Sequence, residues 1–214
     1  KPDNLTISGL TADKTYYVRV RSYTNVGSKT YYGPWSDIKN IKTAKYDITK
    51  ASVSGISTKA YTGKAITQNI TVKYNGTALK NGTDYTTSYS NNKKIGKAIV
   101  KITGKGKYGG IITKTFTINP AKQEIQKLTS KSKAFFVDWA QKGSATGYEI
   151  QYATNSKFTN AKKVTIKNNK TDKTTISKLR GNKKYYVRVR SYTAVNGTKY
   201  YGAWSVSKSV TTKK

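Results

Sequence analysis

The chain of 214 residues contains no cysteine, histidine or methionine, and only three prolines. Without cysteine it has no disulfide, thiolate metal site or thiol nucleophile. Without histidine it lacks the commonest general base and metal ligand. We therefore expect no catalytic residue, no cofactor and no metal site in these residues. The absence of disulfides is compatible with export, because exported proteins do not require them.

Acidic residues are also scarce, since nine Asp and Glu stand against 41 Lys and Arg, which gives a net charge of +32. No two acids are close in sequence, so no carboxylate dyad or calcium loop is indicated. Asp138 and Glu149 are predicted to lie on adjacent strands, where they could face one another, and we expect them to form ion pairs with lysine. The positive charge leaves two interpretations open, a solubilising surface that discourages strand aggregation or attraction to a polyanion.

Long apolar runs are missing as well. No stretch approaches the roughly 20 apolar residues that span a bilayer, so we expect no membrane span. No charged and then apolar signal segment leads the chain, and an internal fragment of an exported protein would lack one too.

What the chain does have is an internal repeat. The string YYVRVRSYT runs from Tyr16 to Thr24 and again, 169 residues later, from Tyr185 to Thr193. The same offset relates Ile7, Leu10, Tyr31, Gly33, Trp35 and Ser36 to Ile176, Leu179, Tyr200, Gly202, Trp204 and Ser205. Such self-similarity indicates an array of modules. A strand-rich stretch, 121–172, precedes the second copy and only three residues precede the first, so we expect the chain to begin inside a domain.

Residues 121–214 read as strands throughout. Alternation places Tyr185, Val187 and Val189 on one face of a strand over about 184–193, and Arg188 and Arg190 on the other. Further strands are expected at 134–139, 147–153, 162–167 and 174–179, and after the Asn196-Gly197 turn in a last strand that carries Trp204 and Val206 and extends to about Thr212. This strand density is typical of an immunoglobulin-like sandwich. The expected core residues are Trp139, Tyr148, Ile150, Leu179, Tyr185, Val187 and Val189.

Residues 121–214 resemble a fibronectin type III domain, through Trp139 at the position of the core tryptophan and through the spacing of Leu179 to Tyr185. The resemblance implies a tyrosine corner, in which the hydroxyl of Tyr185 caps a loop backbone. Residues 1–45 resemble only the last three strands of that domain, with Tyr16 as the corner tyrosine. The equivalents of its first strands and of its tryptophan are missing there.

Residues 46–120 have a different rhythm of short alternating runs. Their phrases KAYTGKAI, VKYNGTALKNGTDYT and ITGKGKYGG resemble a bacterial immunoglobulin-like repeat of Firmicutes surface proteins. The glycines of 104–110 form hairpin turns in this interpretation, because a phosphate-binding loop requires a following helix and a strand is expected instead. The predicted fold is all-β, with tandem immunoglobulin-like β-sandwich modules at 1–45, 46–120 and 121–214, the first one truncated.

One pattern of side chains could carry binding. Arg188 and Arg190 point outward beside Trp204, and Arg19, Arg21 and Trp35 repeat the arrangement. A guanidinium over an indole is favourable by about 0.5–1 kcal/mol at an exposed site. The pattern resembles the arginine–tryptophan ladder of cytokine-receptor fibronectin modules, although each copy has a single Trp-Ser pair. We favour a ladder that rigidifies the sheet, because both copies keep it, over a face that stacks on a sugar ring or base.

These patterns predict non-catalytic stalk, spacer and adhesion modules of a secreted or cell-wall-attached bacterial surface protein, located outside the cell, at its surface or in its wall. One alternative is a binding module for an anionic polymer, such as a cell-wall polymer, a glycan or nucleic acid. Another is the accessory tail of a secreted hydrolase whose catalytic domain lies outside this chain.

The expected partners are other modules of the same polypeptide and, weakly and in a salt-sensitive way, an anionic cell-wall polymer or glycan. The half-domain raises a further expectation, since Ile7, Leu10, Val18 and Val20 would face water if residues 4–44 stood alone. Each exposed side chain would forfeit about 1.5–3 kcal/mol of burial. We therefore expect an upstream segment or a neighbouring copy to complete residues 4–44.

Overall fold

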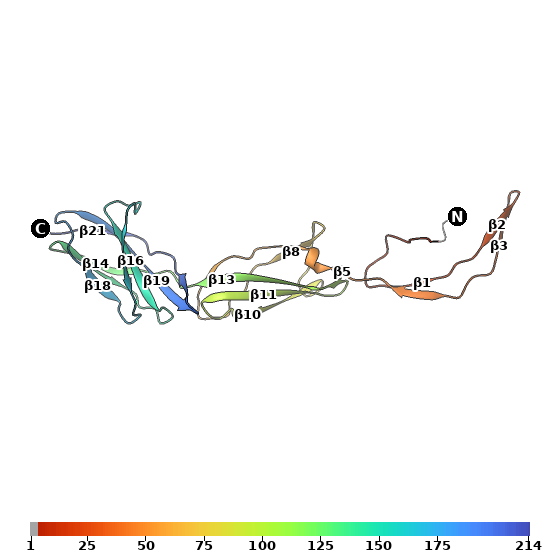
Figure 1. The fold of residues 1–214 in the computed structure, drawn as a ribbon, viewed down its shortest axis with the longest axis horizontal. Coiled ribbons are helices and arrows are strands. Elements are labelled where there is room, and N and C mark those ends of the chain that lie inside the picture. The colour runs from red at the N-terminus through yellow and green to blue at the C-terminus, as the bar shows by residue number, and fades with distance from the viewer. Residues whose placement is uncertain (1–3) are drawn as a thin grey trace. The chain divides into compact units, whose positions relative to one another are not determined.

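The computed structural model describes residues 4–214 (Figure 1), so the first residues of the predicted 1–45 module lie outside it. The fold is all-β, apart from one short 3-10 turn at Ile48–Lys50. The chain divides into two compact units. The first comprises residues up to Ser54 together with 70–88 and 101–113, and the second comprises 55–69, 89–100 and 114–214. Each unit is described by itself below.

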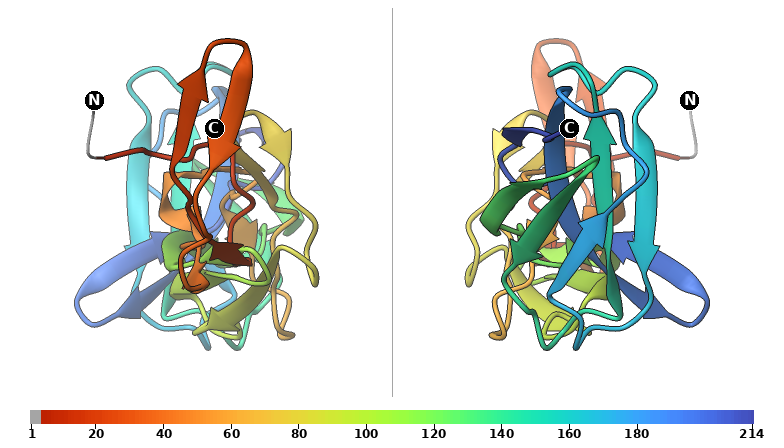
Figure 2. Two further views of the ribbon diagram at one scale, coloured as in Figure 1. Left: turned by 90° about the vertical axis from the view of Figure 1, so that its right-hand side faces the viewer. Right: turned by 90° about the vertical axis from the view of Figure 1, so that its left-hand side faces the viewer.

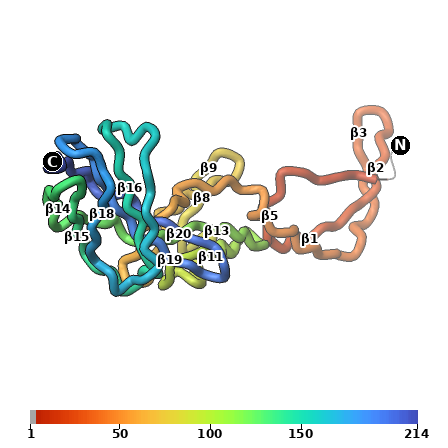
Figure 3. Tube along the Cα trace, turned by 60° about the vertical axis from the view of Figure 1, so that its left-hand side comes forward, coloured from red at the N-terminus to blue at the C-terminus, as the bar shows by residue number. Residues whose placement is uncertain are grey.

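The C-terminal part of the second unit is a sandwich of two antiparallel sheets (Figure 3). One sheet has the order β14 (Ile125–Lys131), β15 (Ala134–Trp139) and β18 (Lys173–Ile176). The other has the order β17 (Lys162–Ile166), β16 (Gly147–Ala153), β19 (Lys184–Val195) and β20 (Thr198–Tyr201), and β21 (Lys208–Thr211) also pairs with β19. The strands predicted for 121–214 are thus present except that the last one is interrupted, and no helix occurs among them.

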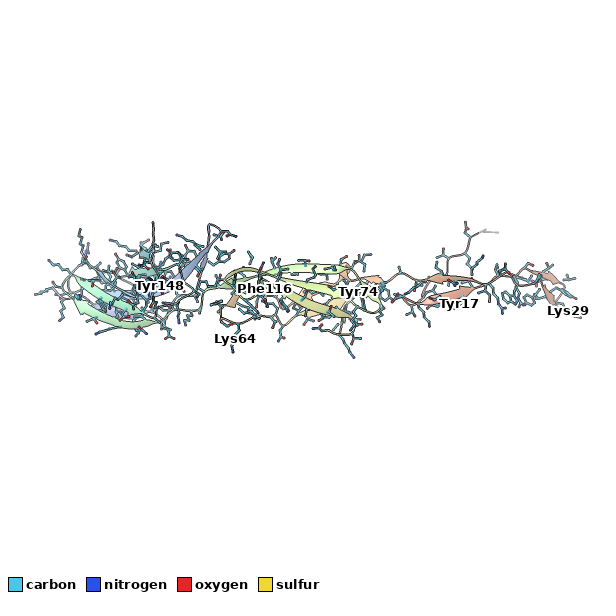
Figure 4. The ribbon with its side chains drawn as sticks, turned by 90° about the horizontal axis from the view of Figure 1, so that it is seen from below. Tyr17, Lys29, Lys64, Tyr74, Phe116 and Tyr148 are labelled. Atoms are coloured by element: carbon cyan, nitrogen blue, oxygen red, sulfur yellow. The ribbon has the colours of Figure 1, made fainter. Side chains whose placement is uncertain are left out.

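The core of this sandwich consists of the inward positions of both sheets. Along β19 buried and half-buried residues alternate, with Val187 and Val189 fully buried. Trp139 and Tyr148, the latter labelled inside the sandwich in Figure 4, are also fully buried and pack with ring centroids 5.4 Å apart. The predicted core is confirmed, because Trp139, Tyr148, Ile150, Tyr185, Val187 and Val189 are buried in one cluster and Leu179 packs against it partly buried.

The last predicted strand is interrupted, which corrects the sequence-based expectation. Residues 202–207, including Trp204 and Val206, lie between β20 and β21 and belong to neither strand. The cause is a local bridge to β19, in which the Ser205 N–H donates to the Val189 carbonyl at 2.8 Å while the Ser205 hydroxyl accepts from the Val189 N–H at 3.0 Å. The Ser205 hydroxyl thus accepts the Val189 N–H in place of the backbone carbonyl that would accept it in a regular antiparallel ladder.

The middle of the chain contains three sheets. A four-stranded sheet has the order β10 (Tyr85–Ser90), β11 (Gly96–Gly104), β13 (Ile111–Asn119) and β7 (Lys59–Ala60). A three-stranded sheet has the order β6 (Ser52–Ser54), β8 (Thr71–Tyr74) and β9 (Thr77–Ala78). The third is the parallel pair β5 (Tyr46–Asp47) and β12 (Tyr108–Gly109).

Each unit buries apolar side chains in this region. In the first unit Val72 and Ile102 are fully buried, and the rings of Tyr46, Tyr74 and Tyr108 meet with centroids 5.5–5.6 Å apart. In the second unit the buried cluster is Ile66, Ile95, Ala98, Phe116 and Ile118.

Turn chemistry explains how these strands connect. Asn75 and Gly76 join β8 to β9 with φ values of 48° and 80°, and Asn196 and Gly197 join β19 to β20 with 48° and 78°. Positive φ at both central residues is the hairpin geometry that Asn-Gly favours. The glycine-rich stretch 104–110 leads into strand β13 rather than a helix, so the hairpin interpretation of that stretch is confirmed.

Segment 4–44 contains two strand pairs, β1 (Thr15–Val18) with β4 (Lys39–Lys42) and β2 (Tyr23–Val26) with β3 (Lys29–Tyr32). The β2–β3 hairpin stands in front in the left view of Figure 2. The expectation of three strands is wrong, because residues 4–10 form none. Their counterpart β18 is held by β15, and no equivalent of β15 lies beside residues 4–10 in the described chain.

Candidate functional site: the arginine–aromatic faces

The arginines of β19 stack on Trp204. Alternation along the strand turns Arg188 and Arg190 to the half-buried outer face. The guanidinium carbon of Arg188 lies 4.7 Å from the Trp204 ring centroid, and that of Arg190 lies 4.4 Å from it. Both distances are within the roughly 6 Å over which a cation is attracted to a ring face. The predicted geometry is therefore present, although Trp204 lies in the strand break rather than on a strand.

Two more rings extend the stack. Arg188 lies 4.0 Å from the centroid of Phe158, and Arg190 lies 4.0 Å from that of Tyr201. The order is thus Phe158, Arg188, Trp204, Arg190, Tyr201. The repeat contains a signal for the tyrosine, since Tyr-Tyr-Gly recurs before each Trp. The sequence contains no such signal for Phe158. This residue lies in a loop between β16 and β17, where it has a φ of 57°.

Strand β16 fixes the arginines from the side. The register of β16 and β19 sets Glu149 opposite Arg190 and Gln151 opposite Arg188. Arg190 donates from Nε and Nη2 to Glu149 Oε2 at 3.0 and 2.6 Å, and Arg188 Nε donates to Gln151 Oε1 at 2.7 Å. Lys163 Nζ lies 3.1 Å from the other Glu149 oxygen. Each guanidinium is thus held both at its edge and on its faces.

These contacts change two pKa values. Burial raises the pKa of Glu149, but the hydrogen bonds and charges of Arg190 and Lys163 outweigh it and leave the pKa below its usual range. Burial and the neighbouring charge of Arg190 lower the pKa of Arg188. The expected ion pair of Glu149 with lysine is present, and Arg190 joins it.

The expectation that Asp138 faces Glu149 is wrong. Asp138 lies on β15 and Glu149 on β16, and these strands belong to different sheets. The connection between them crosses from one sheet to the other, as in Greek-key sandwiches, so these two strands are not neighbours although they are consecutive in sequence.

The first copy repeats the stack. Arg19 and Arg21 lie 4.3 and 4.5 Å from the Trp35 ring centroid, and Arg21 lies 3.7 Å from that of Tyr32. Trp35 remains 45% exposed. Among residues 4–214 no carboxylate forms a salt bridge with Arg21, unlike its counterpart Arg190.

Both corner tyrosines make the hydrogen bond that the resemblance implies. The Thr11 N–H donates to the Tyr16 hydroxyl at 2.8 Å, and the Arg180 N–H donates to the Tyr185 hydroxyl at 3.3 Å. The bonds from Thr11 and the charge of Lys14 lower the pKa of Tyr16. A further loop is capped in the same way, since the Lys142 N–H donates to the Tyr148 hydroxyl at 2.8 Å.

A concave pocket of about 470 Å³ is a feature that the sequence did not indicate, and none of the five stacked side chains lines it. Its lining includes the rings of Tyr152 and Tyr185 and four cationic side chains, Lys162, Lys178, Arg180 and Lys183. No carboxylate lines it. Lys178 has a φ of 59° and is thus a non-glycine residue in the left-handed region. Such a pocket is chemically suited to an anion.

In the part of the chain that is described, no three His, Cys, Asp or Glu side chains come together as a metal site would need. Residues 4–214 contain no helix that is long and apolar enough to cross a membrane. The arginines and aromatic rings of these faces form a set of stacked and hydrogen-bonded groups.

Comparison with known proteins finds one family model that matches part of the chain. Residues 119–207 match the family model of the fibronectin type III domain. No curated protein matches the sequence. One similar solved structure is that of the FN1–FN3 domains of chicken CNTN1, with 17% identity over 92% of this chain and 78% of that chain and a TM-score of 0.40. Another is a myokine structure, with 14% identity over 44% of this chain and 99% of that chain and a TM-score of 0.37. A third is β-1,2-glucanase from Parabacteroides distasonis, with 16% identity over 55% of this chain and 18% of that chain and a TM-score of 0.38.

The matched residues contain the whole stack of the second copy and its corner tyrosine. This part of the chain is therefore similar to a fibronectin type III domain. The family match does not include the first copy or the middle strands.

Proposed function

We propose that the chain consists of non-catalytic spacer and adhesion modules of a secreted or cell-wall-attached bacterial surface protein. The observation that supports this most directly is the fibronectin type III match at 119–207, a domain type that is typical of extracellular proteins. The resemblance of 46–120 to a bacterial immunoglobulin-like repeat supports the bacterial surface. The proposed module limits are 1–45, 46–120 and 121–214.

The packing supports a mechanical role. The C-terminal sandwich has its own buried core, so it requires no neighbour to stay folded. Its exposed sheet face is tied together by the five-member stack and by the bonds to Glu149 and Gln151. Side chains that are bonded to each other across neighbouring strands make the sheet stiffer. Stiffness is the property that a spacer under mechanical load requires.

Surface exposure on the producing cell tests the location. Antibodies raised against residues 121–214 should label intact cells, and external protease should remove the label without lysis. A cytoplasmic enzyme serves as the control and should stay intact. Labelling that requires permeabilised cells would contradict the proposal.

Limited proteolysis of the purified chain tests the module limits. We expect the first cuts near 44–46 and 120–122, which leave a resistant fragment that ends at Lys214. Early cuts within β14–β19 would contradict an independently folded C-terminal module.

Binding of an anionic polymer is the second candidate function. The net charge of +32 and the cationic pocket without a carboxylate favour it. In this function the chain would hold a wall polymer, an acidic glycan or nucleic acid. Substitution of Lys178 and Lys183 by Gln should then weaken binding much more than substitution of Lys93 and Lys94, two lysines of another module. If the two pairs of substitutions weaken binding equally, the binding depends on the overall charge and not on the pocket.

A further inference from the structure

The loop before the corner tyrosine differs in charge between the two copies of the repeat. The leucine and the tyrosine that anchor this loop recur at the same offset, whereas two positions between β18 and β19 change from an uncharged residue to a cation. Gly9 of the first copy corresponds to Lys178, and Thr11 corresponds to Arg180. Both cations line the cationic pocket. The anchors of the loop are thus common to both copies, and these two cationic side chains belong to the second copy alone.

Lys178 occupies a backbone position that suits glycine. Its φ is 59°, and the corresponding Gly9 has a φ of 75°. Glycine adopts this left-handed region readily because it has no Cβ, whereas a lysine there costs free energy. Strained residues of this kind cluster at functional sites. The second copy thus keeps a lysine where the first copy has glycine in the same conformation, and that lysine lines the cationic pocket.

Arg180 is the arginine whose guanidinium is not engaged by other side chains. The other four arginines stack on aromatic rings. Within residues 4–214 the Arg180 side chain forms neither a ring contact nor a salt bridge, and the pocket lysines Lys162, Lys178 and Lys183 form no salt bridge either. The planar fork of Arg180 is therefore available to bind two oxygens of one anion.

Two buried hydroxyl groups belong to the same pocket. Tyr152 and Tyr185 line it and are 9% and 7% exposed. The Tyr185 hydroxyl accepts from the Arg180 N–H, and in the described part of the chain the Tyr152 hydroxyl has no hydrogen-bond partner. Burial and, less strongly, the neighbouring Tyr185 raise the pKa of Tyr152, so its hydroxyl keeps a proton to donate. Buried polar groups are normally hydrogen-bonded, so this donor indicates a ligand.

A second wall of the pocket is fixed before any ligand binds. Asn155 holds the connection between β16 and β17, since its side chain donates to the Thr159 carbonyl and accepts from the Thr159 N–H, both at 3.1 Å. Phe158 of the same connection packs on Arg188 at 4.0 Å. Asn155 and Thr159 line the pocket. The site is thus preorganised, which lowers the entropic cost of binding.

The groups in the pocket favour a compact anion with more than one charge. Both tyrosine rings are almost completely buried, so neither offers an open face on which a base or a sugar ring could stack. The lining instead presents one guanidinium, three ammonium groups and two hydroxyls, without a carboxylate. A phosphate monoester matches this set, because it carries a charge of about −1.5 to −2 at neutral pH and three strong acceptor oxygens. A sulfate ester or an internal phosphodiester carries a single negative charge.

We propose that the cationic pocket is a binding site for a phosphate monoester on a sugar or polyol, with Arg180 and Lys178 at the phosphate oxygens and the Tyr152 hydroxyl as a further donor. In the second candidate function, on which this inference rests, the ester would be the phosphorylated end of a wall polymer or glycan. DNA and heparin carry their charge mainly on internal diesters and sulfates, so they meet the surface lysines instead.

Titration of the isotope-labelled full chain with glycerol phosphate, followed by NMR at about 150 mM salt, tests the site. The resonances that shift should belong to residues 152–162 and 178–185. Glycerol sulfate should bind at least roughly tenfold more weakly, because one charge is missing. No histidine or carboxylate lines the pocket, so affinity should rise with the second ionisation of the phosphate, near about pH 6. Equal binding of inorganic phosphate would overturn the ester as the ligand.

Three variants connect binding to the named side chains. Lys178→Gly restores the residue of the first copy and should weaken glycerol phosphate binding roughly tenfold, without lowering the melting temperature, because the strain is relieved. Tyr152→Phe should weaken binding roughly fivefold at unchanged stability. Lys133→Gly is the matched control, since Lys133 also has a positive φ, 46°, and does not line the pocket. Equal weakening by the two lysine variants would assign binding to net charge and overturn the proposal.

A parallel measurement with polymers separates the two possible failures. If DNA and heparin bind the chain but glycerol phosphate leaves the pocket resonances unshifted, the pocket site is wrong and unspecific polymer binding stands. If glycerol phosphate binds and depends on Lys178, but no phosphorylated polymer is retained, the polymer function is wrong and the pocket takes a soluble sugar or polyol phosphate.

Discussion

At the scale of single residues, a few rings stack on four of the five arginines. Trp204 lies between two guanidinium groups, each worth about 0.5–1 kcal/mol on an exposed ring. We expect Trp204→Ala to lower the free energy of unfolding of the C-terminal module by about 1–2 kcal/mol, the sum of the two contacts. Urea unfolding followed by Trp139 fluorescence measures this. Trp35→Ala is the matched control and should leave that transition unchanged, whereas a comparable loss there would contradict the assignment.

The corner tyrosine gives a second prediction for one residue. Tyr185→Phe removes only the hydroxyl that accepts from the Arg180 N–H, in a ring that is otherwise buried. The loss should be about 1 kcal/mol, the usual net value of one hydrogen bond. Thermal unfolding of the variant tests it, and Tyr16→Phe serves as the control because Tyr16 belongs to the other copy. A change below the error of the measurement would show that the loop does not need this cap.

Glu149 makes the stability of the C-terminal module depend on pH. Its pKa in the folded state is lower than its usual value of 4.5, in spite of burial, because Arg190 and Lys163 stabilise the carboxylate. The contribution is therefore complete above pH 4.5 and is lost as pH falls through the lowered pKa. Glu149→Gln should lower stability by about 1.5–3 kcal/mol at pH 7, the value of charged hydrogen bonds, and should reduce the loss between pH 5 and 2. Glu124→Gln, at an exposed position, is the control and should leave the stability at pH 7 within about 0.5 kcal/mol of the wild type.

At the scale of strands, β19 and its counterpart carry the same residues in different surroundings. Val187→Ala should cost about 1.5–3 kcal/mol, since two buried methyl groups are removed from a filled core. Val18→Ala removes the same groups from an exposed position and should leave the main unfolding transition within about 0.5 kcal/mol of the wild type. Denaturant midpoints of the two variants decide this, and similar losses would show that the first copy is also covered in solution.

The strands themselves were accessible to sequence reasoning because alternation is a local property. The alternation of Tyr185, Val187 and Val189 with Arg188 and Arg190 is enough to assign the two faces of β19. The pairing of strands is not local, and this is why Asp138 and Glu149 were wrongly expected to face one another.

The stack was predictable only in part for the same reason. The repeat indicated that Arg188, Arg190 and Trp204 act together. Phe158 reaches the stack from a loop whose course depends on tertiary contacts, and no pattern near it reveals this. The break in the last strand likewise depends on the Ser205 hydroxyl bonding across to Val189, an interaction that strand propensity does not describe.

At the scale of the whole chain, the dominant property is the excess of lysine. Most of the 41 basic residues are lysines, and only five are arginines. Four of those arginines are engaged with rings. The groups left to meet a polyanion are thus mainly hydrated point charges without the planar fork that selects one anion geometry. The charge should therefore supply affinity without much selectivity.

Polyanion binding should consequently be strong in low salt and largely indifferent to the polymer. We expect affinities for DNA and heparin within about tenfold of each other, with log K falling linearly in log salt by about 0.9 per DNA phosphate neutralised. Titration between 50 and 400 mM salt measures the slope, and an unrelated neutral β-sandwich is the control. Replacement of any two exposed lysines should then lower the slope by a similar amount. The contrary outcome is a polymer that stays bound above physiological salt and is released only when Lys178 and Lys183 are replaced. It would show that the cationic pocket selects its ligand by shape and that the expected indifference to the polymer is wrong.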